Sequence, residues 1–324
     1  MKILLTGASG FVGSHILDAL RARNFDTAIL LRSFSSKKLI AAHLSSVEVR
    51  PGSIDDPESL REAMSGITHV VHCAGATKAR STAEFYEVNQ AGTRSVVSAV
   101  NAEKVTRLIH ISSLAAAGPA VAARPAREDD PPRPVSDYGR SKLAGEKEVC
   151  EGAKCEYVIL RPPALYGPRD AEFLRLFKAV KRHLLPKMGG GQALSLLFVR
   201  DLAEAVVRSL EAPGVAGKTF FVASREVVTA SSMASQVAAQ MKTWTIPLPF
   251  PTVFFWPLCL AQEMMTRLTG KANVLSLQKY AELSAPGWVC DPARFEKEAG
   301  YACGTTLDEG ISQTLTWYRE NRWL

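Results

Sequence analysis

The strongest constraint on the fold is a regular alternation of short apolar segments with helix-like segments. Between the apolar segments the spacing is helical, as in residues 11–23, where Val12, Ile16 and Leu20 fall on one face. Nearly all-apolar strands that alternate with helices form parallel sheets covered on both faces. We therefore expect a doubly wound α/β domain with strands at 2–7, 26–32, 46–52, 68–75, 106–113, 155–162 and 218–224.

This alternation stops after residue 163. The remaining sequence shows mostly helical patterns broken by prolines, which predicts a smaller, mostly helical second domain. Residues 196–210 are the exception, because they indicate a strand and a helix that return to the first domain. We assign residues 1–162 and 196–223 to the first domain, and residues 163–195 and 224–324 to the second.

Composition narrows the classes of function. Six cysteines are scattered without a C-x-x-C pair, which favours reduced thiols and no metal site. The first residues hold too short an apolar run for a secretory signal, so we expect a cytoplasmic protein. The net charge is +7, but the basic residues form no dense stripe and no aromatic RNA-binding motif accompanies them. We therefore expect a small-molecule substrate and no nucleic-acid partner.

A glycine motif, "TGASGFVG", follows the first predicted strand and begins the first helix. Gly7 permits a tight turn, Gly10 permits close approach of a ligand, and Gly13 permits close packing of helix on strand. Bare backbone amides at a helix N-terminus suit a pyrophosphate. The motif predicts a dinucleotide site of the Rossmann type, with further contacts from Ser9, Phe11 and Val12.

The end of the second predicted strand bears on which dinucleotide is bound. Enzymes that use NAD commonly place a carboxylate there, on the ribose hydroxyls. This chain has Leu31 and Arg32 instead, followed by Ser33 and Lys37. A guanidinium binds phosphate well, so the pattern favours NADP, with NAD remaining open.

Two further strand ends complete the predicted cofactor site. Ser53 and Ile54 follow the third strand, where they can face the adenine. Ala74 and Gly75 end the fourth strand, and their small size lets the cofactor lie close. Asn89, in the next helix, can hold water or backbone near the active site.

Tyr138 and Lys142 lie four residues apart in "SDYGRSK", so a helix places them on one face. An ammonium beside a phenol favours the phenolate, which predicts a pKa for Tyr138 shifted down toward working pH. A tyrosine and a lysine at this spacing occur by chance in many chains. The pair becomes informative only together with the other motifs.

Those motifs occur in a specific order: the glycine motif, "HCAG" (72–75), "NQAGT" (89–93), "ISS" (111–113), "YGRSK" (138–142) and "RPPALYGP" (161–168). The order resembles the extended short-chain dehydrogenase/reductase family, also called the NAD-dependent epimerase/dehydratase family. The resemblance implies that Ser113, Tyr138 and Lys142 are catalytic and that Lys142 and Pro162 contact the cofactor. It also implies that Tyr138 exchanges a proton with the substrate oxygen while a hydride moves. Family members often dimerise through helices that correspond to 83–101 and 137–150.

Within the family, "SSLAAAG" (112–118) lacks the acidic pair of the dehydratases. Together with Arg32 it resembles the 3β-hydroxysteroid dehydrogenase and dihydroflavonol reductase branch, which implies a bulky, apolar ketone or alcohol as substrate. Two alternatives stay open, a sugar-nucleotide epimerase that uses NAD and a non-catalytic dinucleotide-binding redox sensor. The epimerase draws support from basic residues that could bind a diphosphate or simply form a solvated helix face: Arg169, Arg175, Lys178, Lys181 and Arg182.

Residues 246–265, "IPLPFPTVFFWPLCLAQEMM", are apolar but are repeatedly interrupted by proline. The segment cannot form the uninterrupted apolar helix of about 20 residues that spans a bilayer. Three interpretations remain open. Phe254, Phe255 and Trp256 pack the second domain's core, or line an apolar substrate pocket, or rest on a membrane surface helped by the basic charge.

Overall fold

The computed structural model describes residues 1–188, 191–250, 256 and 277–324. Its centre is a sheet of seven parallel strands, which confirms the doubly wound prediction. The order is β10-β6-β5-β4-β1-β2-β3, so the direction of strand addition reverses between β1 and β4. The strands are β1 (Lys2–Thr6), β2 (Asp26–Leu31), β3 (Glu48–Pro51), β4 (His69–His72), β5 (Arg107–Ile111), β6 (Glu156–Arg161) and β10 (Lys218–Phe221).

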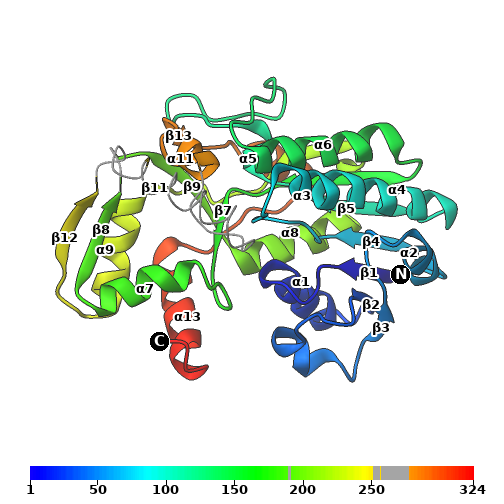
Figure 1. Ribbon diagram of the computed structural model, residues 1–324, viewed down its shortest axis with the longest axis horizontal. Helices are drawn as coiled ribbons and strands as arrows, with labels where there is room; N and C mark the ends of the chain where they lie inside the picture. The colour runs from blue at the N-terminus through cyan, green and yellow to red at the C-terminus, as the bar shows by residue number, and fades with distance from the viewer. Residues whose placement is uncertain (189–190, 251–255, 257–276) are drawn as a thin grey trace.

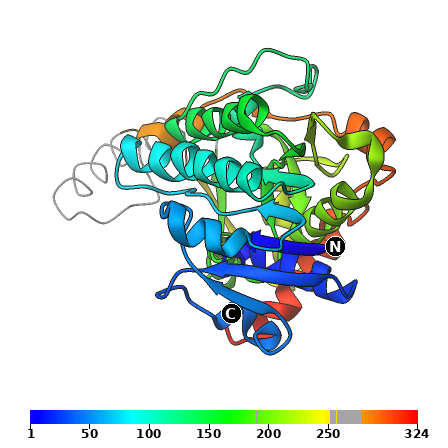
Figure 2. The same cartoon turned by 90° about the vertical axis from the view of Figure 1, so that its right-hand side faces the viewer.

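Helices cover both faces of this sheet (Figures 1 and 2). One face carries α1 (Phe11–Ala22) and α8 (Val199–Glu211), which pack against each other. The other face carries α2 (Pro57–Met64), α3 (Thr82–Tyr86), α4 (Gly92–Ala102) and α6 (Asp137–Gly152). A π-helical segment (Glu87–Ala91) joins α3 to α4, and the short α5 (Leu114–Ala117) precedes α6.

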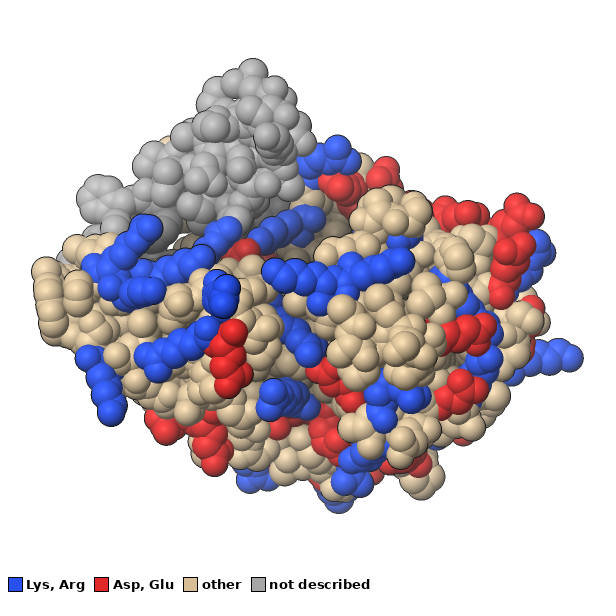
Figure 3. All heavy atoms as spheres, turned by 90° about the horizontal axis from the view of Figure 1, so that it is seen from below, with Lys and Arg blue, Asp and Glu red and all other residues tan. Residues whose placement is uncertain are grey.

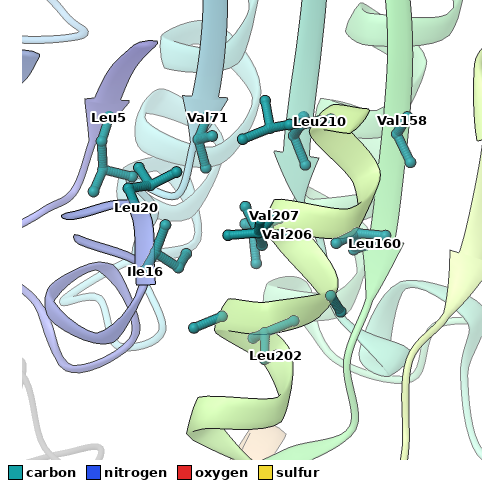
Figure 4. Packing of buried hydrophobic residues seen from close by; sticks show 14 of the residues in the cluster. Leu5, Ile16, Leu20, Val71, Val158, Leu160, Leu202, Val206, Val207 and Leu210 are labelled. Carbon is teal, nitrogen blue, oxygen red and sulfur yellow. The ribbon is translucent and has the colours of Figure 1, made fainter. Parts of the chain in front are cut away.

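Alternate residues of each strand enter different cores because successive side chains point to opposite faces. Leu5, Val71 and Val158 pack with α1 and α8, as Figure 4 shows. Their neighbours Leu4 and Val70 pack under the helices of the opposite face. Because both faces of the sheet are buried, the sequences of these strands are continuous apolar runs. Burial of each large side chain stabilises the fold by roughly 1.5–3 kcal/mol.

The C-terminal part contains two small sheets that the helical pattern of its sequence did not predict. One sheet holds β7 (Ala164–Tyr166), β9 (Ala193–Phe198), β11 (Val227–Thr229) and β13 (Gly287–Trp288). The other pairs β8 (Leu184–Met188) with β12 (Ile246–Phe250). The described C-terminal residues also form the helices α7 (Phe173–Lys181), α9 (Ala230–Gln240), α11 (Leu277–Leu283), α12 (Ala293–Ala299) and α13 (Leu307–Glu320).

The strand expected to return to the first domain belongs instead to the second sheet. It is β9, which pairs with β7, β11 and β13, whereas the following helix, α8, does return to the main sheet. The strand is apolar on both faces because Leu197 packs in the first core while Leu196 and Phe198 pack in the second. The apolar composition of β9 is therefore equally compatible with a buried strand of the main sheet and with a buried strand of the second sheet. The domain boundaries themselves remain a prediction.

The described residues include most of the cysteines and part of the apolar segment 246–265. The five cysteines among them, Cys73, Cys150, Cys155, Cys290 and Cys303, are free thiols. The same residues contain no cluster of three or more potential metal ligands and no helix suited to crossing a bilayer. Phe254 and Phe255 lie outside the described residues, and Trp256 is half exposed.

Candidate active site

A large cavity lies over the carboxyl ends of β1 and β4, where the sheet reverses its order and α/β proteins bind ligands. Its volume is about 1650 Å³, larger than the roughly 300–1,000 Å³ of a site for one small ligand. It extends from the glycine motif to Leu194 and Trp288 of the second sheet. Every residue predicted for the site lines it: Gly7, Ser9, Gly10, Phe11, Val12, Gly13, Arg32, Ser53, Ile54, Ala74, Gly75, Ser113, Tyr138, Lys142 and Pro162.

The three glycines meet different surroundings. Gly7 has a φ of +75°, and a Cβ there would lie 2.7 Å from the backbone nitrogen of Ala74. A Cβ on Gly13 would lie 2.1 Å from the carbonyl oxygen of Gly7. A Cβ on Gly10 would meet only that same oxygen, at 3.4 Å, so Gly10 borders open space in the cavity. Gly10 caps α1 without a side-chain hydrogen bond, which leaves the helix N-terminus bare for an anion.

Arg32 lies exposed at the end of β2 and lines the same cavity. Its guanidinium sits 4.7 Å from the ring centroid of Phe34, in a cation–π contact. Among the described residues it forms no ion pair with a carboxylate. Its charge is therefore available to an anionic ligand at this end of the cavity.

Local capping places the catalytic candidates. Ser136 caps α6 by accepting a hydrogen bond from the backbone of Gly139 at 3.1 Å, which sets Tyr138 in the first turn. Lys142 follows one turn later on the same face. Ser113 ends the segment after β5 and caps α5, accepting from the Ala115 amide at 3.1 Å. The same Ser113 hydroxyl lies near enough to the Tyr138 phenol to lower the pKa of that phenol.

The electrostatics of Tyr138 differ from the expectation. Burial raises the pKa of Tyr138 to about 12, although the hydrogen bond from Ser113 acts in the opposite direction. Burial also lowers the pKa of Lys142 to about 8, and its ammonium donates to the Ile111 carbonyl at 2.6 Å. The predicted downward shift of the Tyr138 pKa is therefore wrong for this structure, because desolvation is the largest effect on the phenol and it raises the pKa. At neutral pH Tyr138 is a neutral phenol, the form that donates a proton.

One group of buried polar residues was not predicted. The Glu146 carboxylate accepts from the guanidinium of Arg161 at 2.9 and 2.6 Å, and also from the Ser112 hydroxyl. These residues are buried and tie α6 to the ends of β5 and β6. The signal was available in the sequence, because Glu146 stands four residues after Lys142 and Arg161 ends an apolar strand. The group holds the helix that carries Tyr138 in place.

Asn89 secures the loop after β4. Its amide nitrogen donates to the Ser141 hydroxyl at 2.9 Å and to the Ala76 carbonyl at 3.0 Å. Its oxygen accepts from the Ala76 amide at 2.8 Å. The expectation that Asn89 holds backbone near the site is confirmed, and its side chain links this loop to Ser141 of α6.

Large apolar side chains line the part of the cavity beyond Tyr138, together with polar and acidic residues such as Asp170, Gln192 and Glu282. The Phe85 ring lies 6.1 Å from the Tyr138 ring, and Leu165, Leu194 and Trp288 complete this wall. The cations that line this part within the described chain are Lys78 and Arg80, paired with Glu172 and Glu84 respectively.

The basic residues considered for a diphosphate lie elsewhere. None of the five appears among the described residues that line the cavity. Arg169 pairs with Asp18 of α1 at 2.8 Å, and the exposed Arg175 pairs with Glu172 at 3.3 Å. In the described chain, the substrate end of the cavity therefore offers no unpaired cation to a nucleotide diphosphate.

The fold and this site define an enzyme of the extended short-chain dehydrogenase/reductase class with a nicotinamide dinucleotide site. Residues 3–223 match the model of the NAD dependent epimerase/dehydratase family, and the chain belongs to that family.

Its relatives include a ceramide reductase of Caulobacter vibrioides, 30% identical over 99% of this chain and 96% of that protein. A UDP-glucose 4-epimerase of Vibrio cholerae is 27% identical over 97% of this chain and 94% of that protein. The crystal structure of a Thermotoga maritima UDP-glucose 4-epimerase superposes with a TM-score of 0.80 at 20% identity, covering 99% and 100% of the two chains. At that identity the superposition supports the shared fold alone.

Proposed function

We propose that this protein is an NADP-dependent ketoreductase that interconverts a ketone and a secondary alcohol on a bulky, apolar substrate. The observation that carries the proposal is the lining of the cavity beyond Tyr138, where large apolar side chains are present, several carboxylates would repel a diphosphate, and the described cations are already paired. A sugar nucleotide would bring a diphosphate into this space with no described cation to receive it. The likeness to a ceramide reductase favours a lipid ketone within this substrate class.

The residues of the site suit ketone reduction. When bound, the dinucleotide supplies the hydride that reaches the carbonyl carbon. Tyr138, held as a neutral phenol, gives its proton to the carbonyl oxygen, and the C=O group becomes CH–OH. Ser113 hydrogen-bonds the same oxygen and stabilises the charge that develops there. Lys142 lines the same cavity one turn away and supplies an amine of lowered pKa, which would hold the ribose of the bound dinucleotide.

The cofactor half of the proposal rests on the glycines and on Arg32. The open space at Gly10 and the bare start of α1 suit a pyrophosphate. Arg32, exposed and without a carboxylate partner in the described chain, suits the additional phosphate of NADP. The branch that contains 3β-hydroxysteroid dehydrogenases and dihydroflavonol reductases is the part of the family whose motifs agree with this assignment.

A sugar-nucleotide epimerase that uses NAD is the second candidate, favoured by the 27% identity to the Vibrio cholerae enzyme. The two candidates differ in how the cofactor is used. An epimerase regenerates its cofactor within each turnover, whereas a reductase consumes NADPH and must exchange it. A redox sensor, the third alternative, would bind the dinucleotide without turnover.

The test is a turnover assay on the purified protein with NADPH and NADH, offering long-chain 3-keto lipids in one arm and UDP-glucose in the other. We expect NADPH oxidation with the keto lipid and loss of at least about 100-fold in Tyr138→Phe, since general acid catalysis contributes roughly 10²–10⁴-fold. NADPH affinity should be retained. Tyr157→Phe is the matched control, because Tyr157 lies on β6 and is not among the residues that line the cavity.

Two other results would each support one of the alternative functions. Tightly retained NAD with conversion of UDP-glucose would support the epimerase. Dinucleotide binding that is unaffected by Tyr138→Phe, with no turnover of any ketone, would support the sensor.

A further inference from the structure

The strand pair formed by β8 and β12 presents an exposed apolar surface away from the cavity. Trp244 is 65% exposed, Ile246 53% and Leu184 37%. Ile246 and Leu184 are register partners in the two strands, so their side chains lie on the same face of the pair. Side chains of this size are exposed together here although Leu185, the next residue along β8, is buried.

The tryptophan is held in this exposed position by its surroundings. The ring of His183 stacks on the ring of Trp244 with centroids 4.0 Å apart and planes 7° from parallel. The His183 ring also donates to the Trp244 carbonyl at 2.9 Å, and the Ile246 amide donates to the His183 carbonyl at 2.8 Å. The apolar surface is therefore a fixed feature of the fold.

Positive charge surrounds this apolar surface. Lys181 and Arg182 directly precede His183, Lys178 lies one turn earlier in α7, and Lys242 stands two residues before Trp244. All four are exposed, and none has a carboxylate within 4.0 Å in the described part of the chain. Basic side chains gather on the left of Figure 3, the side on which α7, β8 and β12 lie in Figure 1. We call this surface, Leu184, Trp244 and Ile246 with Lys178, Lys181, Arg182 and Lys242, the basic–aromatic surface.

We propose that the basic–aromatic surface docks the protein on an anionic lipid bilayer. Tryptophan favours the boundary between lipid headgroups and hydrocarbon, where its ring is buried and its N–H remains hydrated. Lysines and arginines beside it attract anionic headgroups, and the combination is typical of surfaces that lie on a membrane without crossing it. A second copy of the chain packed symmetrically here would bring the same unpaired cations together, which disfavours that occupant.

This inference goes beyond the proposed reaction and does not depend on it. Binding to lipid uses residues at the edge of the second part of the fold, and the catalytic candidates lie in the cavity. Tyr138→Phe should therefore bind vesicles as the unaltered protein does, whatever reaction the cavity performs.

The test is co-sedimentation of the full-length protein with sucrose-loaded vesicles. One set contains phosphatidylcholine alone, and the other contains phosphatidylcholine with phosphatidylglycerol. We expect binding to the anionic vesicles that weakens with salt, and little binding to the neutral ones. Each basic residue near an anionic surface strengthens binding roughly fivefold, so the double variant Lys181→Glu/Arg182→Glu should bind at least about 25-fold more weakly. Trp244→Ala should also weaken binding to the anionic vesicles. The loss in this variant should depend less on salt concentration than the loss in the double charge variant.

The matched control is Lys147→Glu/Lys154→Glu, which reverses two exposed lysines in α6 and just beyond it. This control should bind the anionic vesicles nearly as well as the unaltered protein. Both double variants should have the melting temperature of the unaltered protein. Three outcomes would overturn the proposal: no binding of the unaltered protein to anionic vesicles, equal loss in both double variants, or a stable dimer that Trp244→Ala converts to a monomer.

Discussion

Gly10 and Gly13 stand three residues apart in one motif, yet their surroundings require glycine for different reasons. At Gly13 the helix backbone passes so close to Gly7 that a Cβ would overlap a carbonyl oxygen. At Gly10 the neighbouring space belongs to the cavity, and a methyl group would meet no protein atom closer than 3.4 Å. One position is needed for folding, and the other leaves room for a ligand.

The two alanine variants should therefore fail differently. Gly10→Ala should fold with a melting temperature close to that of the unaltered protein and lose NADPH affinity by at least about tenfold. Gly13→Ala should be strongly destabilised or fail to fold, because overpacking against backbone cannot be relieved by a rotamer change. Thermal melts and NADPH titrations of both variants measure the difference. Equal melting temperatures for the two would contradict this account.

At the residue scale, the sequence was sufficient to predict which residues line the cavity. It was not sufficient to predict whether the pKa of Tyr138 is raised or lowered. Motif order and four-residue spacing are local properties, and the predicted residues do line one cavity. The pKa of Tyr138 depends on how much water the folded chain excludes, and that follows from packing between segments far apart in sequence.

Helix α6 is held against the sheet by buried charge as well as by apolar contact. Glu146, on the same face as Lys142, is paired with Arg161 of β6, and their side chains are 4% and 8% exposed. Removing one partner of a buried pair leaves the other charged and desolvated, which typically costs 3–5 kcal/mol.

We expect Glu146→Gln to lower the free energy of unfolding by about 3 kcal/mol. Combined with Arg161→Met, the loss should be smaller than the sum of the two single losses, because the residues interact directly. Glu148→Gln is the matched control in the same helix. It removes a partner from Arg94, whose side chain is 63% exposed, and should cost no more than about 1 kcal/mol. Denaturant unfolding measures all four variants, and equal losses at Glu146 and Glu148 would contradict the assigned role.

Helices and strands could be predicted from the sequence where the spacing of apolar residues determines them. The seven strands of the main sheet were evident because burial on both faces leaves a continuous apolar run. The destination of β9 was not evident, because a strand placed between two cores carries the same pattern. The short strands β8 and β12 contain prolines, which weaken the strand signal in the sequence.

Global stability should depend on pH through Lys142. Burial lowers its pKa from 10.5 to about 8 in the folded protein. Between these values the unfolded chain binds more protons than the folded one at this site, so the contribution of Lys142 to folding stability rises with pH. Below pH 8 the cost of burying the ammonium is fully present, and it is relieved as pH rises toward 10.

The comparison with Lys142→Met isolates this contribution from other titrating groups. We expect the free energy of unfolding of the unaltered protein, relative to the variant, to increase steadily between pH 8 and 10. Urea unfolding of both proteins at pH 7, 8, 9 and 10 measures it. A difference that stays constant across this range would mean that Lys142 keeps an ordinary pKa in the fold.

The cavity is continuous from the glycine motif to the second sheet, and this continuity has a kinetic meaning for the proposed reaction. Direct hydride transfer requires the reductant and the substrate to occupy this one space at the same time. The reaction then proceeds through a ternary complex, with no stage at which the protein alone stores the reducing equivalent.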